Sequence, residues 1–519
     1  MSSIDFATLK FRDVLNDANA ECIIVHDILK DAVRRCSALA GPFANVPLLM
    51  FPAFTSILTL YRLLHQEQRL GIARPDLRSM RRKGFAYIDH VDLAEGLDAG
   101  AKEIGTIFDP PPEPLPADWA FALASKFLNF MPGRRKVALF SWELGRDLPD
   151  ELLRNGFSVL GPAGRPLGVS LAAQWPSVER AIDEICVRFG MERDNRALKD
   201  LLLAHSRHYL AEGRVEPLLA DVLVVGNLYH IPNRLMAARA RSAGIPVVTV
   251  GHGQASGMAG DPVLGYGERT LATHELGYAT SGMRDRLAMP RAQSMIAADE
   301  PISAIPSDAE KVAAIFREGA GIKPLDFRRN SRIYYVPTTF NDLHTYGPHR
   351  SMPDLIYARW QQHLLDQFPE VALKAYPWTK ASTDWAYDAI EPPRICRDQF
   401  ELVLDRADGF VFDYISTAFV LACATDKPIV YFDVGLRDPS PLALEVIRER
   451  CIYVRVDRVL DPSLRAQVSA QAGKAKTNRI TTTFSLEGLG EPRVRSLVRG
   501  LKRLLAQKGA EQAERQLAS

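Results

Sequence analysis

The sequence predicts an α/β protein made of two Rossmann-like domains with a cleft between them. Apolar strands, small-residue turns and amphipathic helices alternate along most of the chain, as in layered parallel sheets. The 519 residues suit two or three domains, at roughly 100–200 residues each. Continuous apolar runs such as DVLVVGN at 221–227 are typical of strands buried on both faces. Ligands of such sheets bind beyond the carboxyl ends of the strands, so the cleft is the expected site.

Composition excludes some classes of function. The net charge is +2, from 64 basic and 62 acidic residues, so nothing global favours a nucleic-acid partner and none is expected. Six scattered cysteines fit no zinc spacing and predict buried thiols in a reducing cytoplasm. Charges near the N-terminus argue against an export signal, so the expected location is cytoplasmic. The apolar stretch 48–64 is short and interrupted by Pro52 and Arg62, which favours a buried or membrane-surface helix over a span.

In the first half, one βαβ unit stands out. A strand at 221–227 leads into a helix at 231–244 that should end at Gly244, and a second buried strand follows at 245–253. The remaining elements are assigned from shorter patterns. Further strands are predicted at 20–27, 45–52, 86–91, 136–145 and 157–164. Helices are predicted at 28–39, between the strand at 136–145 and residue 153, and at 178–212.

In the second half, a strand and helix at 275–288 precede a connector at 291–330 that is rich in Ala, Pro and Asp and holds one helix. Strands are then predicted at 331–340 and 371–378, a helix at 354–367, and helix, strand, turn, helix and strand across 400–433. The predicted organisation is a first Rossmann-like domain (1–290), a connector (291–330), a second Rossmann-like domain (331–490) and a basic amphipathic helix with a tail (491–519).

The segment 409–433, GFVFDYISTAFVLACATDKPIVYFD, carries the strongest motif. A buried strand ends at Asp413, a tight turn follows, and Ser416 and Thr417 stand at a helix start. Free N–H groups and the positive end of the helix dipole make such a position a natural phosphate site, and hydroxyls add donors. The alternative is that Ser416 only caps the helix.

The stretch DYISTAFVLACATDKPIVYFD at 413–433 is similar to the "DYSS…D…KPI" segment of CDP-glycerol glycerophosphotransferases. It also resembles the corresponding part of bacterial capsule and lipopolysaccharide glycosyltransferases. The resemblance covers about residues 221–433 and implies a GT-B-like fold. It further implies that Ser416 and Thr417 contact the phosphate of a nucleotide-activated donor, with Asp413 in the same donor-binding set.

A histidine follows the strand at 245–250. His252 lies between Gly251 and Gly253, which allow a sharp turn and close approach of a substrate. Histidine titrates near neutral pH, as a general base requires. The resembled family has a His-Gly pair after the equivalent strand, which implies that His252 deprotonates the acceptor hydroxyl. The alternative is a structural histidine that bonds to the loop backbone.

The resembled family often has His-Pro at the end of the strand at 371–378, but this chain has Tyr376-Pro377. Tyrosine cannot carry a positive charge near neutral pH, so Lys374 is predicted to supply it. The alternative for Lys374 is a solvated lysine.

Other strand-end loops complete the predicted site. Thr338 and Thr339 are predicted to reach the donor phosphate, where the resembled family has a similar "APT". On the acceptor side, the predicted residues are Asn227, His230 and Gly253, together with Asn233; for His230 and Asn233 the alternative is a helix-start role.

Together these features predict a glycosyltransferase that moves a sugar from a nucleotide-activated donor to a glycan or lipid-linked acceptor in surface polysaccharide or glycoconjugate synthesis. The alternatives are a CDP-glycerol-type polyol-phosphate transferase and a catalytically inert GT-B-like scaffold. No cofactor beyond the donor substrate is expected. No DxD-like pair follows a buried strand, so no metal is expected either. GxxxxGK[ST], HExxH and GxSxG are absent.

The last helix carries one apolar stripe among basic residues. The stripe consists of Val494, Leu497, Val498, Leu501, Leu504 and Leu505. One interpretation is that 491–508 contacts the inner face of the cytoplasmic membrane, because basic residues beside an apolar stripe suit an anionic surface. The other is that the stripe packs on a domain and the basic residues form a solvated face.

Overall fold

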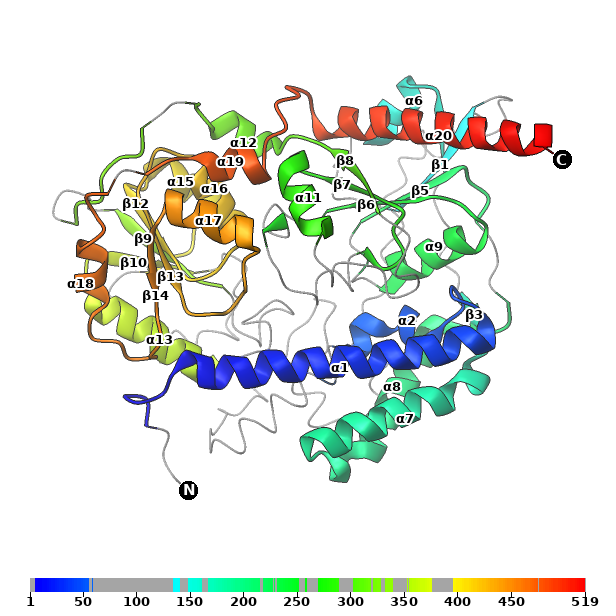
Figure 1. Ribbon diagram of the computed structural model, residues 1–519, viewed down its shortest axis with the longest axis horizontal. Coiled ribbons are helices and arrows are strands. Elements are labelled where there is room, and N and C mark those ends of the chain that lie inside the picture. Colours follow the sequence, from blue (N-terminus) through cyan, green and yellow to red (C-terminus); the bar gives the residue numbers. More distant parts are fainter. Residues whose placement is uncertain are drawn as a thin grey trace.

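Two separate six-stranded parallel sheets form the protein (Figure 1). The α/β class and the two Rossmann-like domains of a GT-B-like fold are therefore confirmed. The computed structural model describes residues 5–55, 58, 134–140, 148–160, 167–214, 218–226, 228, 231–251, 257–258, 269–288, 302–318, 321–327, 332–338, 352, 354–375, 395–474 and 476–518. The predicted strand at 86–91 lies outside them.

The first sheet has the order β2-β1-β5-β6-β7-β8, with every pair parallel. Its strands are β1 (Arg135–Phe140), β2 (Phe157–Leu160), β5 (Val222–Val225), β6 (Val247–Val250), β7 (His274–Gly277) and β8 (Ser303–Pro306). The order of strands reverses between β1 and β5. The segment predicted as a connector supplies β8, the sixth strand, as well as helix α12 (Glu310–Ile315).

The second sheet has the order β11-β10-β9-β12-β13-β14, again all parallel. Its strands are β9 (Ile333–Val336), β10 (Val371–Lys374), β11 (Ile395–Cys396), β12 (Gly409–Phe412), β13 (Ile429–Asp433) and β14 (Ile452–Arg455). The chain builds β9 to β11 toward one edge and then returns to place β12 on the other side of β9. This reversal between β9 and β12 is the kind of switch point at which open α/β sheets bind ligands.

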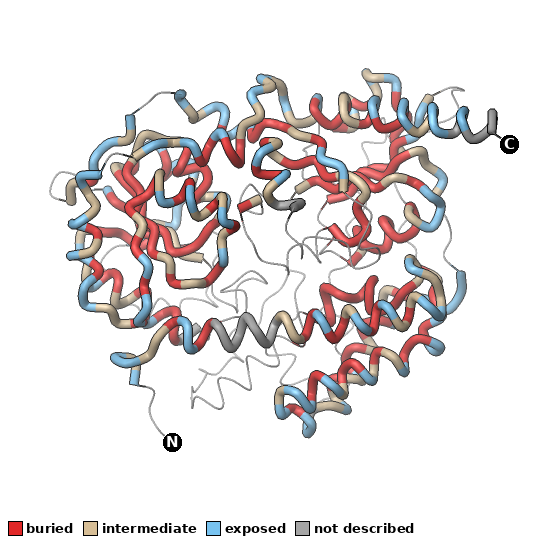
Figure 2. Tube along the Cα trace, in the orientation of Figure 1, coloured by how far each residue is buried: buried red, intermediate tan, exposed pale blue. Residues whose placement is uncertain are grey.

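Helices cover both sheets, and their buried faces make the cores of the two domains (Figure 2). In the first domain these are α6 (Leu148–Arg154), α7 (Leu171–Phe189), η3 (Glu192–Asp194), α8 (Asn195–Tyr209), α9 (Ile231–Ser242) and α11 (Thr280–Ala288), with a small parallel pair β3 (Leu167–Val169) and β4 (Leu210–Glu212). In the second they are α13 (Asp354–Gln367), α15 (Phe400–Arg406), α16 (Thr417–Cys423), α17 (Pro441–Arg450), α18 (Leu464–Ser469) and α19 (Arg479–Phe484). The predicted helix at 354–367 and the order of elements across 400–433 are confirmed.

The predicted strand at 20–27 is wrong, because one helix, α1 (Phe11–Ala40), covers that segment. On either side of 16–22, its buried apolar residues follow helical spacing: Phe11, Val14, Leu15, Val25, Ile28, Leu29, Ala32, Val33 and Cys36. The first three pack in the second domain and the next five in the first, where Cys36 lies against the carbonyl of Gln174 on α7. Helix α1 therefore runs along both domains, on the side opposite the C-terminal helix (Figure 1).

The predicted strand at 45–52 is also wrong. Asn45 accepts a hydrogen bond from Leu48 N at 3.1 Å, and Pro47 stands in the first turn of helix α2 (Val46–Leu49). Both are helix-start signals, and they override the apolar run. The buried side chains of α2 lie in the core of the first domain. Among the described residues, no helix is both long and apolar enough to cross a membrane.

The C-terminal helix α20 (Arg493–Ala518) packs on the first domain (Figure 1). Leu497, Val498, Leu501, Leu504 and Leu505 are buried in one cluster with residues of β1, β5 and β8, and Val494 is half-buried against that cluster. A Cβ on Gly500 would come within 2.7 Å of Ile305, so this glycine allows the helix to lie close to β8. The interpretation of the stripe as a membrane-facing surface is therefore wrong, and the packing alternative is confirmed.

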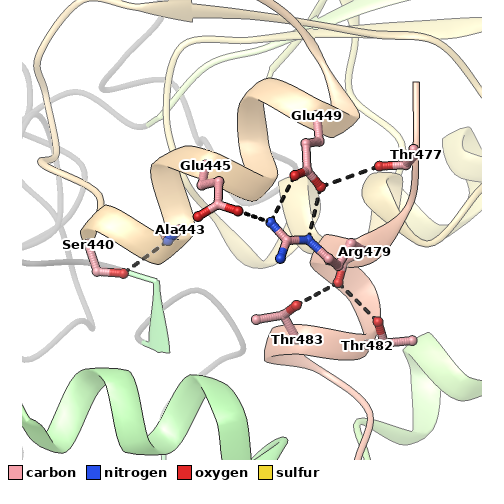
Figure 3. Close-up of polar contacts among 8 residues, drawn as sticks. All are labelled: Ser440, Ala443, Glu445, Glu449, Thr477, Arg479, Thr482 and Thr483. Atoms are coloured by element: carbon pink, nitrogen blue, oxygen red, sulfur yellow. Dashed lines mark hydrogen bonds and ion pairs between the residues drawn. The ribbon is translucent and has the colours of Figure 1, made fainter. Parts of the chain in front are cut away.

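Helix α19 joins the two domains on the route to α20. Arg479 at its start donates to Glu449 at 2.8 and 3.0 Å and also to Glu445, and both acids are on α17 (Figure 3). On the first-domain side, Ser281 of α11 donates to the carbonyl of Thr483 at 2.6 Å. The crossing chain is thus tied to a helix of each domain.

Candidate functional site

The switch point of the second sheet brings two predicted segments together. Strands β9 and β12 pair in parallel with Phe412 opposite Val336, so their carboxyl ends lie side by side. Thr338 follows β9 by two residues, and Asp413 follows β12 directly. The sheet topology therefore places the predicted Thr338 loop beside the segment that leads to Ser416.

Asp413 is buried at this point, with 1% of its surface exposed. Its carboxylate accepts hydrogen bonds from Tyr335 OH at 2.5 Å, Trp360 Nε1 at 2.9 Å and Tyr357 OH at 3.1 Å. Burial raises the pKa of this carboxyl from 3.8 to about 6, and the three hydrogen bonds oppose the rise. The carboxylate faces β9 and α13, and both of its oxygens accept hydrogen bonds from side chains of these elements.

This environment distinguishes Asp413 from the more exposed Ser416 and Thr417, the other predicted donor-binding residues of this segment. Three donors from within the domain hold its oxygens, and a buried carboxylate would repel a phosphate. Tyr357 OH also accepts the backbone N–H of Thr338 at 3.0 Å. Asp413 is therefore a positioning residue, which holds the ends of β9 and β12 and the Thr338 loop in one arrangement.

Ser416 and Thr417 stand at the start of α16, as predicted. The Ser416 hydroxyl accepts from Phe419 N at 3.2 Å, so the capping role is confirmed. A serine hydroxyl that accepts one bond still has its own proton to donate. Thr417 is exposed and Ser416 is half-buried, so neither hydroxyl is closed off by the core.

Lys374, at the end of β10, is 4% exposed and donates from Nζ to the carbonyl of Ala375 at 2.6 Å. The alternative of a solvated lysine is therefore wrong. Burial lowers its pKa, while Cys396 and the acids Asp398 and Glu401 oppose that change. The one hydrogen bond described for Lys374 Nζ goes to the backbone at the end of β10, so the ammonium group lies near the strand ends. Tyr376 and Thr339 lie outside the described residues.

In the first domain, an arginine fixes the end of β6, immediately before His252. Gly251 N donates to Leu276 O at 3.0 Å. Arg493, the first residue of α20, donates from Nη2 to the carbonyls of Gly251 at 3.2 Å and Leu276 at 3.0 Å. Its guanidinium also lies 4.5 Å from the ring centroid of Tyr278. The sequence had suggested only a basic surface residue for Arg493.

The acceptor-side predictions fall largely outside the described part of the chain: this applies to His252, Gly253, Asn227 and His230. Asn233 is described, and it is buried in the first turn of α9 with 6% of its surface exposed. That position agrees with the helix-start alternative. Gly244 has a φ of 66°, which confirms its predicted place after α9.

The loop after β13 reaches the first domain. Ser440 N, at its end, donates to the carbonyl of Met258 at 2.9 Å. Met258 is buried among residues of the second domain and lies six positions after His252. The segment that follows β6 therefore reaches the second domain, where it contacts the end of the loop after β13.

Arg437, in the same loop after β13, is a site residue that the sequence analysis did not identify. It is 8% exposed, and it donates from Nη1 to the carbonyl of Ile415 at 3.3 Å. A basic residue in the loop after KPIVYFD was the available signal. Nothing in the sequence indicated that its side chain returns to the 413–416 turn. Within the described residues, no group of three or more His, Cys, Asp or Glu side chains is placed to hold a metal.

No protein-family model and no curated protein matches this chain. Solved structures with similarity include MnaA of S. aureus with UDP, at 10% identity and a TM-score of 0.34, over 72% of this chain and 97% of that one. The spinosyn forosaminyltransferase SpnP has 14% identity and a TM-score of 0.30, over 72% and 91%. The glycosyltransferase SnogD of Streptomyces nogalater has 13% identity and a TM-score of 0.29, over 72% of this chain and 99% of that one. Likenesses at this level say nothing of this chain's own activity.

Proposed function

We propose that this protein is a glycosyltransferase that takes a nucleotide-activated donor at the switch point of the second sheet and an acceptor on the first domain. The observation that supports this most is the convergence of loops between the domains. The Ser416–Thr417 helix start lies at the β9–β12 switch point, and the loop after β13 contacts the segment that follows His252. A donor and an acceptor held on opposite domains would meet there.

In this proposal the donor phosphate is bound by Ser416, Thr417, Thr338 and Thr339, with Lys374 supplying positive charge. Hydrogen-bond donors placed where a leaving group gains charge stabilise the transition state. Asp413 acts behind them by holding Tyr335 and Tyr357 in place. We propose that these side chains bind the phosphate without a bridging metal.

On the other domain, His252 is the proposed general base, with Asn227, His230 and Gly253 beside the acceptor. His252 takes the proton of the acceptor hydroxyl while that oxygen attacks the anomeric carbon of the donor. The bond from this carbon to the donor phosphate breaks, and the nucleotide leaves with the electron pair. For a lipid-linked acceptor, we propose that the exposed basic residues of α20, Arg495, Lys502 and Arg503, contact the inner membrane face in place of the buried stripe.

A panel of CMP-, CDP-, UDP- and GDP-linked donors tests this function. We expect one class of sugar donor to be hydrolysed or transferred with release of its nucleotide. Release of CMP from CDP-glycerol would instead favour the polyol-phosphate transferase, which needs the same phosphate site. If no donor binds or turns over, the chain is a scaffold without this activity.

The double substitution of Ser416 and Thr417 by alanine should weaken binding of the free nucleotide by several kcal/mol at most, because hydrogen bonds to a charged group contribute about 1.5–3 kcal/mol each. Isothermal titration calorimetry measures the change. Ser440→Ala is the matched control, because Ser440 caps α17 at 3.1 Å in the same way but is fully buried (Figure 3). Unchanged affinity in the double variant would leave Ser416 with its capping role alone.

A further inference from the structure

Arg437 lies in a short loop that is fixed at both ends. At its start, Gly435 adopts a φ of 81° and donates to Asp433 Oδ1 at 3.1 Å. At its end, Ser440 N bonds to Met258 of the first domain. The loop therefore holds Arg437 at the junction of the two domains.

The guanidinium of Arg437 turns back to the segment that precedes α16. It donates from Nη1 to Ile415 O, and its Cζ lies 4.8 Å from the ring centroid of Tyr414. These contacts place a planar cation directly against the turn that leads to Ser416. With 8% of the residue exposed, water reaches little of it.

This buried charge has no acidic partner among the described residues. Arg437 Nε is buried without a hydrogen-bond acceptor. The two nearby strand-end acids are occupied: Asp413 by its three aromatic donors, and Asp433 by Tyr453 OH and Gly435 N. Asp438, the next residue, is exposed. A carbonyl and a ring face compensate only part of the free-energy cost of burying a full charge.

We propose that Arg437 is the cation that binds the phosphate of the nucleotide-activated donor, an inference that rests on the proposed function and deepens it. A guanidinium offers a rigid fork of N–H donors that matches phosphate oxygens, and its charge persists at every working pH. The start of α16 offers a partial positive charge of roughly half a unit from its N–H groups, and a guanidinium against the same turn adds a full one. Arg437 thus adds a second cation to Lys374 at the end of the sheet where the resembled family has a histidine and this chain has Tyr376.

Calorimetry of Arg437→Gln with a nucleoside diphosphate and with the corresponding nucleoside tests the role. The diphosphate and the nucleoside carry the base of the nucleotide that the wild-type protein binds in the donor panel. We expect affinity for the diphosphate to fall about 10- to 100-fold and affinity for the nucleoside to stay unchanged, because only the diphosphate presents the anion. Arg448→Gln is the matched control, since Arg448 also lies over a tyrosine ring, 5.0 Å from that of Tyr453, but is exposed on α17.

A thermal melt of Arg437→Met separates this role from a structural one. If Arg437 awaits an anion, its removal relieves an unpaired buried charge, and the ligand-free variant should melt at the wild-type temperature or above. The diphosphate should then raise its melting temperature less than it does for the wild type. A lower melting temperature, with diphosphate and nucleoside affinities both reduced, would show a structural arginine and overturn the proposal.

The other outcomes separate this inference from the function on which it rests. If the wild type binds a nucleotide and Arg437→Gln binds it equally well, Arg437 does not bind the phosphate, although the proposed function stands. If the wild type binds no nucleotide of the panel, both fail together.

Discussion

Replacing Asp413 by alanine is expected to destabilise the second domain by about 3–9 kcal/mol, because three buried donors lose their acceptor at about 1–3 kcal/mol each. The donors are Tyr335, Tyr357 and Trp360, on β9 and α13. The tyrosine hydroxyls can rotate to other acceptors, but the Trp360 N–H has only one direction. Chemical denaturation monitored by tryptophan fluorescence measures the loss.

Asp408→Ala is the matched control. Asp408 precedes β12 as Asp413 follows it, and it also links β12 to β9, through an ion pair with Arg332 at 3.0 Å. The Arg332 side chain is exposed, so water compensates for the loss of this pair and Asp408→Ala should cost much less stability than Asp413→Ala. Equal stability losses in the two variants would contradict the anchoring role of Asp413.

The same carboxyl gives a pH dependence with a definite sign. Its pKa is about 6 in the folded protein against 3.8 ordinarily, so the folded state binds this proton more tightly than the unfolded chain. The proton-linked part of the contribution of Asp413 to stability is therefore fully present below pH 4 and is lost as the pH rises through 6, whereas its hydrogen bonds with Tyr335, Tyr357 and Trp360 are a separate contribution. Asp413→Asn cannot titrate, so the wild type should gain up to about 3 kcal/mol relative to it between pH 7 and pH 4. A constant difference would contradict the raised pKa.

Local patterns predicted the second domain well. The stretch 400–433 alternates apolar strands with small residues and an Asp-Lys-Pro turn, and every element there is as predicted. The first domain shows where such patterns fail. Residues 20–27 form an apolar run in a short window, but over 30 residues the apolar positions have helical spacing. Only the longer window shows that α1 is a helix shared by both domains.

The site was harder to predict, because its chemistry depends on contacts between distant segments. Asp413 follows a strand, as ligand-binding residues often do, yet its partners come from 53 to 78 positions away. Arg437 and Arg493 are loop and helix-start residues that resemble surface charges in the sequence. The fold places each of them against a predicted segment that is distant in the sequence. Arg437 bonds to Ile415 and Arg493 bonds to Gly251.

Arg493 gives a structural reason to expect a rigid loop start before His252. It bonds to the carbonyl of Gly251, which follows β6 directly, and to that of Leu276 in β7, and Gly251 N donates to Leu276 O at 3.0 Å. A base must be held at a fixed distance from the proton that it removes. The chain meets this need at the residue directly before His252.

His252→Ala is therefore expected to lower turnover about 10²- to 10⁴-fold, the usual contribution of a positioned base, and to leave donor affinity and melting temperature unchanged. His363→Ala is the control. His363 lies on α13, away from the strand ends, and its ring bonds to the carbonyl of Asp461 at 2.6 Å. A structural histidine at 252 would lower turnover, affinity and melting temperature together. Wild-type turnover in His252→Ala would remove this residue from the mechanism and move the search for the base to His230.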